Sequence, residues 1–178
     1  MGIIGFIIFR IDVGGMYMDF YVREMVEKDL EKVRDIAVES WHATYAAIIP
    51  REIQDDFLRV AYSDEMLKKR LESSHMWVAE TAGKIAGFVD FSPADETGRV
   101  ELRAIYFYPD EQRKGMGTAL LKRGMDELAN ATEVMVEVEK ENRIGLQFYE
   151  EKGFKVVKEF DEDFAGHLMK TVQMVLVI

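Results

Sequence analysis

Hydrophobic and polar residues follow two different periods along this chain, and the changes of period predict its first elements. Apolar and polar side chains alternate at residues 19–25, which predicts a strand. From Leu30 to Trp41 the apolar residues recur at helical spacing, so a helix is predicted to pack one face on a sheet. Pro50 fixes the start of a further helical stretch, which continues to Glu72.

The middle of the chain has the pattern of strands joined by short turns. Residues 77–80 and 84–91 flank a turn at 81–83 that contains glycine, and together they predict a hairpin. A later run at 99–108 is rich in β-branched and aromatic residues and predicts a central strand. Pro109 ends that strand, because proline has no N–H to donate to a sheet.

Helices and strands alternate in the last third of the chain. A helix at 116–129 connects the strand at 99–108 to one at 132–138, and a crossover of this length makes the two strands parallel. The remaining predictions are a helix at 142–152 and strands at 154–160 and 166–178. In the helix at 116–129 the predicted buried residues are Leu120, Leu121, Met125 and Leu128. This order predicts a mixed α/β fold, with a twisted sheet of six to seven strands and helices on both faces.

The length of the chain favours one domain. With 178 residues and 48% hydrophobic content it is long enough for one well-buried core and short for two. We assign that domain to residues 19–178. Residues 1–18 form an N-terminal extension that fits an added strand, a dimer contact or a misplaced start. Its apolar run at 3–9 is far shorter than the ~20 residues of a membrane helix and lacks the features of a secretory signal.

Composition argues against several classes of function. The chain has no cysteine, which removes thiolate nucleophiles, disulfides and cysteine zinc sites and agrees with a reducing, cytoplasmic setting. His42, His75 and His167 are far apart in the sequence, so a metal site is not expected. The net charge of −10 opposes nucleic-acid and anionic-membrane partners and favours a cationic small molecule, although solubility alone would also explain it.

The segment 112–118 has the features of an anion-binding turn. It lies between a predicted strand and a predicted helix, and Gly115 and Gly117 let the backbone approach a ligand closely. The first N–H groups of a helix have no partner within it and point outward. Arg113 and Lys114 add two positive charges, which suit a diphosphate better than a single carboxylate. The segment lacks the third glycine of the dinucleotide fingerprint and the Gly-Lys-Ser/Thr of nucleotide hydrolases.

Two segments together resemble the GNAT acetyltransferases. Gln112-Arg-Lys-Gly-Met-Gly117 is similar to the pyrophosphate loop of that family, and Asn142-Arg-Ile-Gly-Leu-Gln-Phe-Tyr149-Glu-Glu-Lys-Gly-Phe154 is similar to its later helix and the strand that follows. The resemblance covers roughly residues 19–178. It implies acetyl-CoA as the acetyl donor, no metal, and two central strands that splay apart to admit the cofactor. The implied cofactor-binding residues are Ile105, Tyr106 and Phe107 through their main chain, Gln112, Arg113, Lys114, Gly115, Met116, Gly117 and Thr118 in the loop, and Asn142 and Arg143 on the helix.

The same resemblance implies two catalytic residues. Tyr149 matches a tyrosine beside the cofactor sulfur, and a phenol with a reference pKa of about 10 stays protonated at neutral pH and can donate to a departing thiolate. Glu101 matches the position of a glutamate base. Direct deprotonation of an ammonium by a carboxylate is uphill by roughly 8 kcal/mol, so Glu101 would act through ordered water, with a raised pKa, or by holding the ammonium.

Structural roles are the alternatives for these residues. Tyr149 would be a packed aromatic residue, and Glu101 a surface carboxylate paired with Arg103. Asn142 is a favoured helix N-cap, a role that is compatible with cofactor binding. Candidate acceptor-binding residues are Trp41, Tyr45, Glu39 and Asp90. Core packing of Trp41 and surface positions for the two carboxylates are the simpler roles.

The leading hypothesis is an acetyl-CoA-dependent N-acetyltransferase that acts through a ternary complex, since no cysteine is available for a covalent relay. Residues 41–50 and 138–142 resemble the bacterial polyamine N-acetyltransferases related to PaiA, which implies a primary amine of spermidine or spermine as the acceptor. A protein or peptide α-amine acceptor and a non-catalytic acetyl-CoA-binding sensor are the alternatives. A homodimer is compatible with the sequence.

Overall fold

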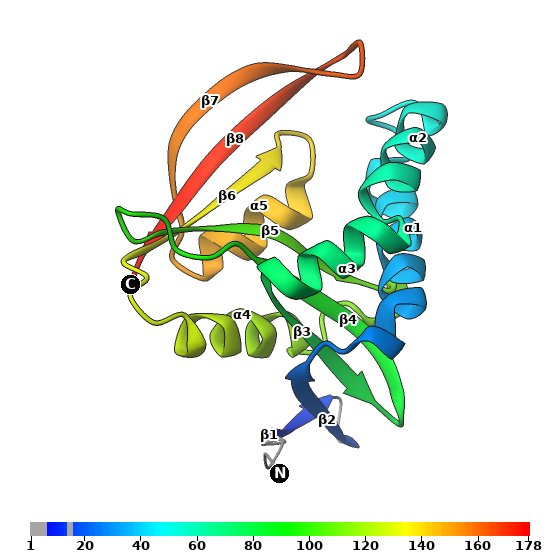
Figure 1. The fold of residues 1–178 in the computed structure, drawn as a ribbon, viewed down its shortest axis with the longest axis vertical. Coiled ribbons are helices and arrows are strands. Elements are labelled where there is room, and N and C mark those ends of the chain that lie inside the picture. The colour runs from blue at the N-terminus through cyan, green and yellow to red at the C-terminus, as the bar shows by residue number, and fades with distance from the viewer. Residues whose placement is uncertain (1–6, 14–15) are drawn as a thin grey trace.

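Eight strands form one mixed sheet in the computed structural model, which describes residues 7–13 and 16–178 (Figure 1). In chain order they are β1 (Ile7–Val13), β2 (Met16–Glu24), β3 (His75–Thr81), β4 (Lys84–Phe91), β5 (Arg99–Phe107), β6 (Glu133–Glu139), β7 (Lys155–Phe164) and β8 (His167–Val177). Their order across the sheet is β1-β2-β3-β4-β5-β6-β8-β7, in which β5 and β6 run parallel and the other neighbours antiparallel. The mixed α/β fold is confirmed, with eight strands in place of the expected six to seven.

Helices cover both faces of this sheet. The helices are α1 (Leu30–Tyr45), α2 (Arg51–Ala61), α3 (Asp64–Ser73), α4 (Met116–Glu127) and α5 (Arg143–Glu151), with short 3₁₀ turns η1 (Glu27–Asp29) and η2 (Pro109–Glu111). The helices α1, α2 and α3 pack on one face, and α4 and α5 on the other. The stretch predicted to run from Pro50 to Glu72 is two helices, because Ser63 interrupts it and accepts a hydrogen bond from the Met66 N–H (3.3 Å) at the start of α3.

The additional strand comes from the N-terminal extension. Residues 7–13 pair with β2, the ring of Phe9 stacks on Phe20 at 5.1 Å between centroids, and Arg10 forms an ion pair with Asp19 at 2.9 Å. An added strand was one of the three interpretations of residues 1–18, and it is the one that residues 7–13 adopt. Most of the apolar run at 3–9 lies outside the described residues.

The sheet lies between two hydrophobic cores, one on each face. The core beneath α4 and α5 contains Leu120, Leu121 and Leu128, which are buried as predicted, whereas Met125 is only partly buried at its edge. The core beneath α1, α2 and α3 includes Trp41, which is 7% exposed. Any ligand that contacts both cores must therefore reach through the sheet.

The sheet opens between β5 and β6. Only three residue pairs join them, with Arg99, Val100 and Glu101 opposite 133–135. On the other side of β5, Leu102 lies opposite Phe91 and Ala104 opposite Asp90, so Arg103 is an extra residue that bulges from the ladder. A bulge increases the local twist of a strand, and beyond it β5 follows β4 while β6 follows β8. The predicted separation of the two central strands is confirmed.

Packing of α4 against the sheet depends on Gly124. A Cβ atom at this position would lie 2.2 Å from Cε2 of Phe91, a ring that is fully buried. We expect Gly124→Ala to lower the free energy of unfolding by about 1–2 kcal/mol, because overpacking outweighs the better helix propensity of alanine. Urea unfolding measures this. Asp126→Ala, at an exposed position of the same helix, is the control and should change stability by less than about 0.5 kcal/mol.

Candidate active site

A cleft of about 1030 Å³ lies where β5 and β6 separate. Its walls come from both faces of the sheet: α1 contributes Ser40, Trp41, Ala43, Thr44 and Tyr45, β5 contributes 102–107, the loop before α4 and its first turn contribute 111–118, β6 contributes 136–138, and residues 141–152 contribute most of the α5 face. The cleft therefore connects the side of α4 and α5 with the side of α1. Of the predicted cofactor-binding residues, all twelve line it.

The loop before α4 is built to receive an anion. Gly115 is the residue before the helix and has a φ of 75°, a left-handed conformation that glycine adopts without strain. No side chain of the described residues caps the first turn and no acidic residue lies in it, so the N–H groups of Met116, Gly117 and Thr118 are left for a ligand. Lys114 pairs with Glu111 at 2.8 Å. Arg113 has no carboxylate partner within residues 7–13 and 16–178, and it is the loop's free positive charge.

The start of α5 faces this loop across the cleft. Asn142 accepts a hydrogen bond from the Gly145 N–H (3.0 Å), so the predicted N-cap is confirmed. A Cβ at Gly145 would lie 2.7 Å from Nδ2 of Asn142, which ties the amide closely to the helix. Arg143 is exposed at the rim of the cleft.

Tyr149 lies on α5 at the inner end of the cleft. It is 7% exposed, and its ring packs edge-on against Phe148 and Phe154 at 5.3 Å between centroids. Burial, together with the nearby Tyr106 and Tyr45 hydroxyls, raises the pKa of Tyr149 well above its usual value. The described residues offer its hydroxyl no hydrogen-bond partner. Tyr149 is thus a packed aromatic residue that keeps a protonated hydroxyl available to a ligand.

Two further aromatic residues reach the cleft from α1. The pKa of Tyr45 is raised mainly by burial, and Tyr106 adds to the rise while Asn142 opposes it. These three residues lie on α1, on β5 and at the start of α5, so the three elements meet at this point of the cleft. Trp41 combines its expected packing role with a place in the cleft wall. Its Nε1–H is buried without a hydrogen-bond acceptor among the described residues.

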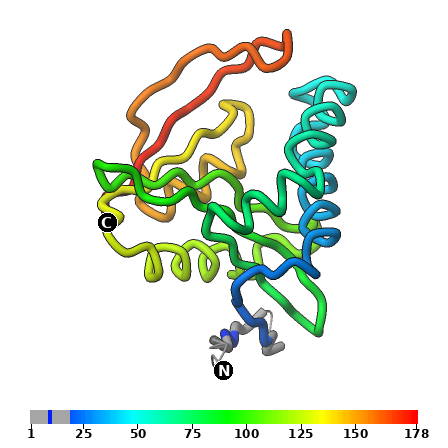
Figure 2. The backbone as a smooth tube through the Cα atoms, in the orientation of Figure 1, coloured from blue at the N-terminus to red at the C-terminus, as the bar shows by residue number. Residues whose placement is uncertain are grey.

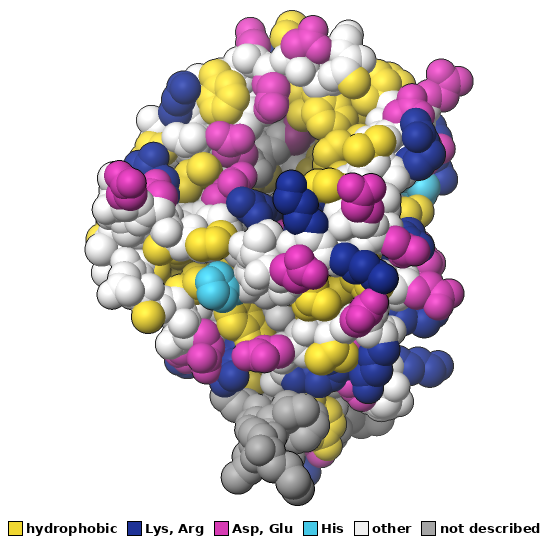
Figure 3. Space-filling view, in the orientation of Figure 1, with side chains coloured by type: hydrophobic (Ala, Val, Ile, Leu, Met, Phe, Trp, Pro, Cys, Tyr) yellow, Lys and Arg dark blue, Asp and Glu magenta, His cyan; other side chains and the backbone are white. Residues whose placement is uncertain are grey.

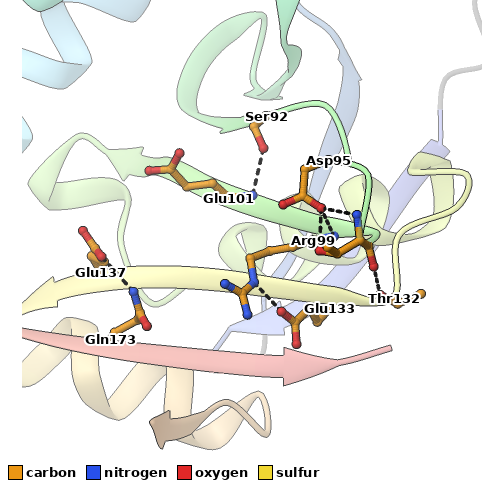
Figure 4. A network of polar contacts seen from close by, with 9 residues as sticks. Ser92, Asp95, Arg99, Glu101, Thr132, Glu133, Glu137 and Gln173 are labelled. Atoms are coloured by element: carbon orange, nitrogen blue, oxygen red, sulfur yellow. Dashed lines mark hydrogen bonds and ion pairs between the residues drawn. The ribbon is translucent and has the colours of Figure 1, made fainter. Parts of the chain in front are cut away.

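Glu101 lies at the last paired position before the strands separate, opposite Met135. Its backbone N–H donates to Ser92 Oγ at 2.9 Å (Figure 4). Its carboxylate is exposed and lies 3.5 Å from Nε of Arg103. It is not one of the residues that line the cleft. The geometry therefore places Glu101 near the opening of the sheet, in the surface ion pair that the sequence offered as its alternative role.

The two other acidic candidates lie apart from the cleft. Glu39 is exposed on α1, as expected. Asp90 was expected at the surface, and this is wrong: it is fully buried, with Arg70 Nε 3.9 Å from one oxygen and no hydrogen bond to either oxygen from the described part of the chain. The reason is that β4 is covered by helices on both faces, so neither side of the strand meets solvent. Burial raises the pKa of Asp90, against the opposing charges of Arg70 and Arg103.

Some cleft residues were missed from sequence. Four of them lie on one face of α5 and the residue after it: Gln147, Phe148, Glu151 and Lys152. The last three follow Gln147 by one, four and five residues, which is helical spacing, and this spacing around the Phe-Tyr pair is the sequence signal that could have identified them. Glu137 on β6 also lines the cleft and accepts a hydrogen bond from Gln173 Nε2 (3.0 Å; Figure 4). Only the pairing of β6 with β8 brings these two residues together.

Comparison with known proteins decides the family. The model of the acetyltransferase (GNAT) family matches residues 30–154. This chain belongs to the GNAT family. It is an N-acetyltransferase whose acetyl donor is acetyl-CoA, and the resemblance inferred from the two sequence segments is confirmed.

Individual relatives are similar over most of their length. Spermidine N(1)-acetyltransferase from Thermoplasma acidophilum is 28% identical over 155 residues, which cover 83% of this chain and 95% of the relative. The uncharacterised N-acetyltransferase YuaI from Bacillus subtilis is 30% identical over 157 residues, or 85% and 89% of the two chains. The crystal structure of the PaiA N-acetyltransferase from T. acidophilum in complex with coenzyme A has a TM-score of 0.76 at 26% identity, covering 89% of this chain and 99% of that one.

The residues of the GNAT cleft fit acetyl-CoA. The uncapped first turn of α4 and Arg113 suit a pyrophosphate, and the gap between β5 and β6 leaves main-chain groups of 102–107 free on one side to bind an extended arm. Among residues 7–13 and 16–178, no group of His, Asp or Glu is arranged to hold a metal ion. No helix in the described part of the chain is long and apolar enough to cross a membrane.

The first turn of α4 gives a test of acetyl-CoA binding. A Cβ at Gly117 would lie 3.3 Å from the Phe148 ring and 3.5 Å from the Phe107 ring, so a branched side chain there has little room and adds bulk beside the free N–H groups. We expect Gly117→Val to weaken acetyl-CoA binding by about 2 kcal/mol or more, roughly thirtyfold in Kd, by calorimetry. Gly117→Ala should give a smaller loss. Unchanged affinity in a folded valine variant would contradict a close approach of the cofactor to this turn.

Proposed function

We propose that this GNAT enzyme transfers acetyl from acetyl-CoA to a primary amine of a linear polyamine such as spermidine or spermine, by direct attack in a ternary complex. The observation that carries the proposal is a cleft that passes through the sheet. An anion-binding loop lies at its α4 side, and carboxylates and aromatic residues lie at its α1 side. The name of the T. acidophilum relative, a spermidine N(1)-acetyltransferase, supports this acceptor.

The charge on the acceptor side supports a cationic substrate. On β6 the residues Val134, Val136 and Val138 point into the core under α4, so Glu137 and Glu139 lie on the opposite face, toward the approach from α1. Glu137 is exposed and lines the cleft, whereas Glu139 is buried and accepts a hydrogen bond from the Glu141 N–H at 2.7 Å. On the neighbouring hairpin Glu162 lies on that face too, where it accepts a hydrogen bond from Thr171 at 2.9 Å. Several carboxylates along one approach lower the energy of a cation there and favour a molecule with more than one ammonium group.

Tyr149 is the proposed donor for the leaving group. Acetyl-CoA, when bound, supplies the acetyl thioester. The raised pKa of Tyr149 keeps its phenol protonated through and above the physiological range. Its hydroxyl can then donate a hydrogen bond to sulfur as negative charge develops and pass the proton late, because a thiol is a stronger acid than this phenol.

Glu101 is the proposed relay for the ammonium proton. Its carboxylate lies at the mouth of the gap, not in the cleft wall, so it would accept the proton through ordered water. The pair with Arg103 lies on an exposed surface and does not hold the carboxylate rigidly. Thiol release from acetyl-CoA with spermidine, spermine, lysine, aminoglycosides and short peptides tests the proposal. Comparable rates with peptides would favour a protein α-amine acceptor, and tight acetyl-CoA binding without turnover of any amine would favour a sensor.

Removal of the Tyr149 hydroxyl tests its role. We expect Tyr149→Phe to lower kcat by about 10²–10³-fold with nearly unchanged acetyl-CoA affinity, because the ring still packs against Phe148 and Phe154. Since burial raises the pKa of Tyr149, the wild-type rate should not fall through loss of this proton up to about pH 10. Glu101→Gln is the contrast. Its defect should recover in part at high pH, where more of the amine is already neutral, and the Tyr149→Phe defect should not.

Ionic strength tests the acidic approach. If carboxylates hold a polyamine, its KM should rise with added salt more steeply than the KM of a neutral or singly charged amine, because screening weakens attraction between exposed charges. Steady-state kinetics with spermidine and a monoamine between about 50 and 500 mM NaCl measure this. Glu137→Gln should reduce the slope for spermidine. Equal slopes for both amines would argue against electrostatic recognition of the acceptor.

A further inference from the structure

The tip of the β7–β8 hairpin contacts the corner between α1 and α2. The ring of Phe164 lies 5.2 Å from Phe57 and 6.0 Å from Trp41 between centroids, and Phe57 stacks on Trp41 at 4.5 Å. We call these three residues the aromatic clasp. Beside it, His167 Nε2–H donates to the Ile48 carbonyl at 2.9 Å, across 119 residues of sequence. In Figure 2 the hairpin, orange to red, leans toward the cyan helices.

The hairpin turn aims Phe164 at the helices. Ala165 and Gly166 both have positive φ, 53° and 83°, and form a two-residue turn that places Phe164 directly opposite His167. Phe164 and Met169 pack at the edge of the core beneath α1, α2 and α3. Because β7 is an edge strand and, among the described strands, pairs only with β8, the clasp and the His167 hydrogen bond anchor the free end of the hairpin.

Trp41 belongs to both the clasp and the cleft. One part of its ring packs with Phe57 and Phe164, and the residue also lines the cleft together with Tyr45. The position of the hairpin therefore bounds the approach to the cleft from the α1 side. Figure 3 shows this approach as a recess, with carboxylates on its hairpin side and hydrophobic side chains on its helix side.

We propose that Phe164 is a specificity-determining residue of the acceptor site, because the clasp converts an open groove into an arch. An acceptor must enter an arch end first. An unbranched polymethylene amine is narrow along its whole length, whereas the α-amine of a peptide brings a side chain and a branched main chain into the arch with it. The inference rests on the proposed function, since it concerns the acceptor side of the same cleft. It adds the element that selects the acceptor by shape, where the carboxylates select it by charge.

Fluorescence tests whether Phe164 holds the clasp. The chain has two tryptophans, and Trp77 is buried in the other core, so Trp77→Phe leaves Trp41 as the only reporter. In that background Phe164→Ala should raise quenching of Trp41 by acrylamide severalfold. Phe160→Ala is the matched control, because Phe160 lies on the same strand under Lys158 and outside the clasp, and it should leave quenching unchanged. If Phe164→Ala does not unfold cooperatively, His167→Ala takes its place, because it removes the imidazole that bonds to Ile48 and leaves the three rings of the clasp in the chain.

Acceptor preference tests the selection itself. For wild type, Phe164→Ala and Phe160→Ala, kcat/KM is compared for spermidine and for a short peptide with a free α-amine, and calorimetry without acetyl-CoA compares binding of the same two molecules. In the Phe164 variant alone, the ratio of kcat/KM for spermidine to kcat/KM for the peptide should fall at least about tenfold. A change of this size is typical when a steric restriction in a binding pocket is lost.

The outcomes separate the two proposals. A wild-type enzyme that uses the peptide as well as spermidine, or neither, overturns the proposed function, and the binding ratio then decides on the clasp. A wild type that prefers spermidine, with an unchanged preference in Phe164→Ala although Trp41 is more exposed, overturns the role of Phe164 and leaves the proposed function standing. Unchanged quenching of Trp41 in that variant overturns the clasp itself.

Discussion

The bulge at Arg103 is the constraint on which the rest of the site depends. It lets β5 follow β4 while β6 follows β8, so the parallel pair ends after Glu101. Beyond that point the main chain of 102–107 has a neighbouring strand on one side only. Backbone groups buried without a partner cost roughly 1–3 kcal/mol each, and a ligand that pairs with them recovers this free energy. The same opening connects the two faces of the sheet, each of which has its own helices and core, and under the proposed function these faces are the acetyl-CoA side and the acceptor side.

The α4 side and the α1 side of the cleft differ in charge, so each side suits a different substrate. The α4 side offers free N–H groups and Arg113, which suit phosphate, whereas the α1 side and β6 offer Glu137 and aromatic rings, which suit an amine. Tyr149 lies between them with a raised pKa, since burial disfavours the phenolate. The packing of its ring against Phe148 and Phe154 holds Tyr149 in the position from which we propose that it donates its proton.

Local patterns in the sequence determined most of the elements and one side of the site. The alternation and helical spacing predicted the strands and helices, because each period reflects which faces of an element are buried. The loop at 112–118 was predictable as a candidate anion site because the features that suit an anion, glycines and a helix N-terminus, are adjacent in sequence. Asn142 as an N-cap was predictable for the same reason.

The tertiary structure alone decided where distant residues meet. Asp90 is buried because helices cover both faces of β4, a fact that the pattern within the strand does not contain. The bulge at Arg103 exists only in the register of β5 against β4, and the pairing of Glu137 with Gln173 only in that of β6 against β8. The clasp joins Trp41 to Phe164, and no local period links residues so far apart. Sequence predicts contacts that follow from a repeating backbone geometry, whereas contacts across the sheet depend on how the strands are ordered and twisted against the helices.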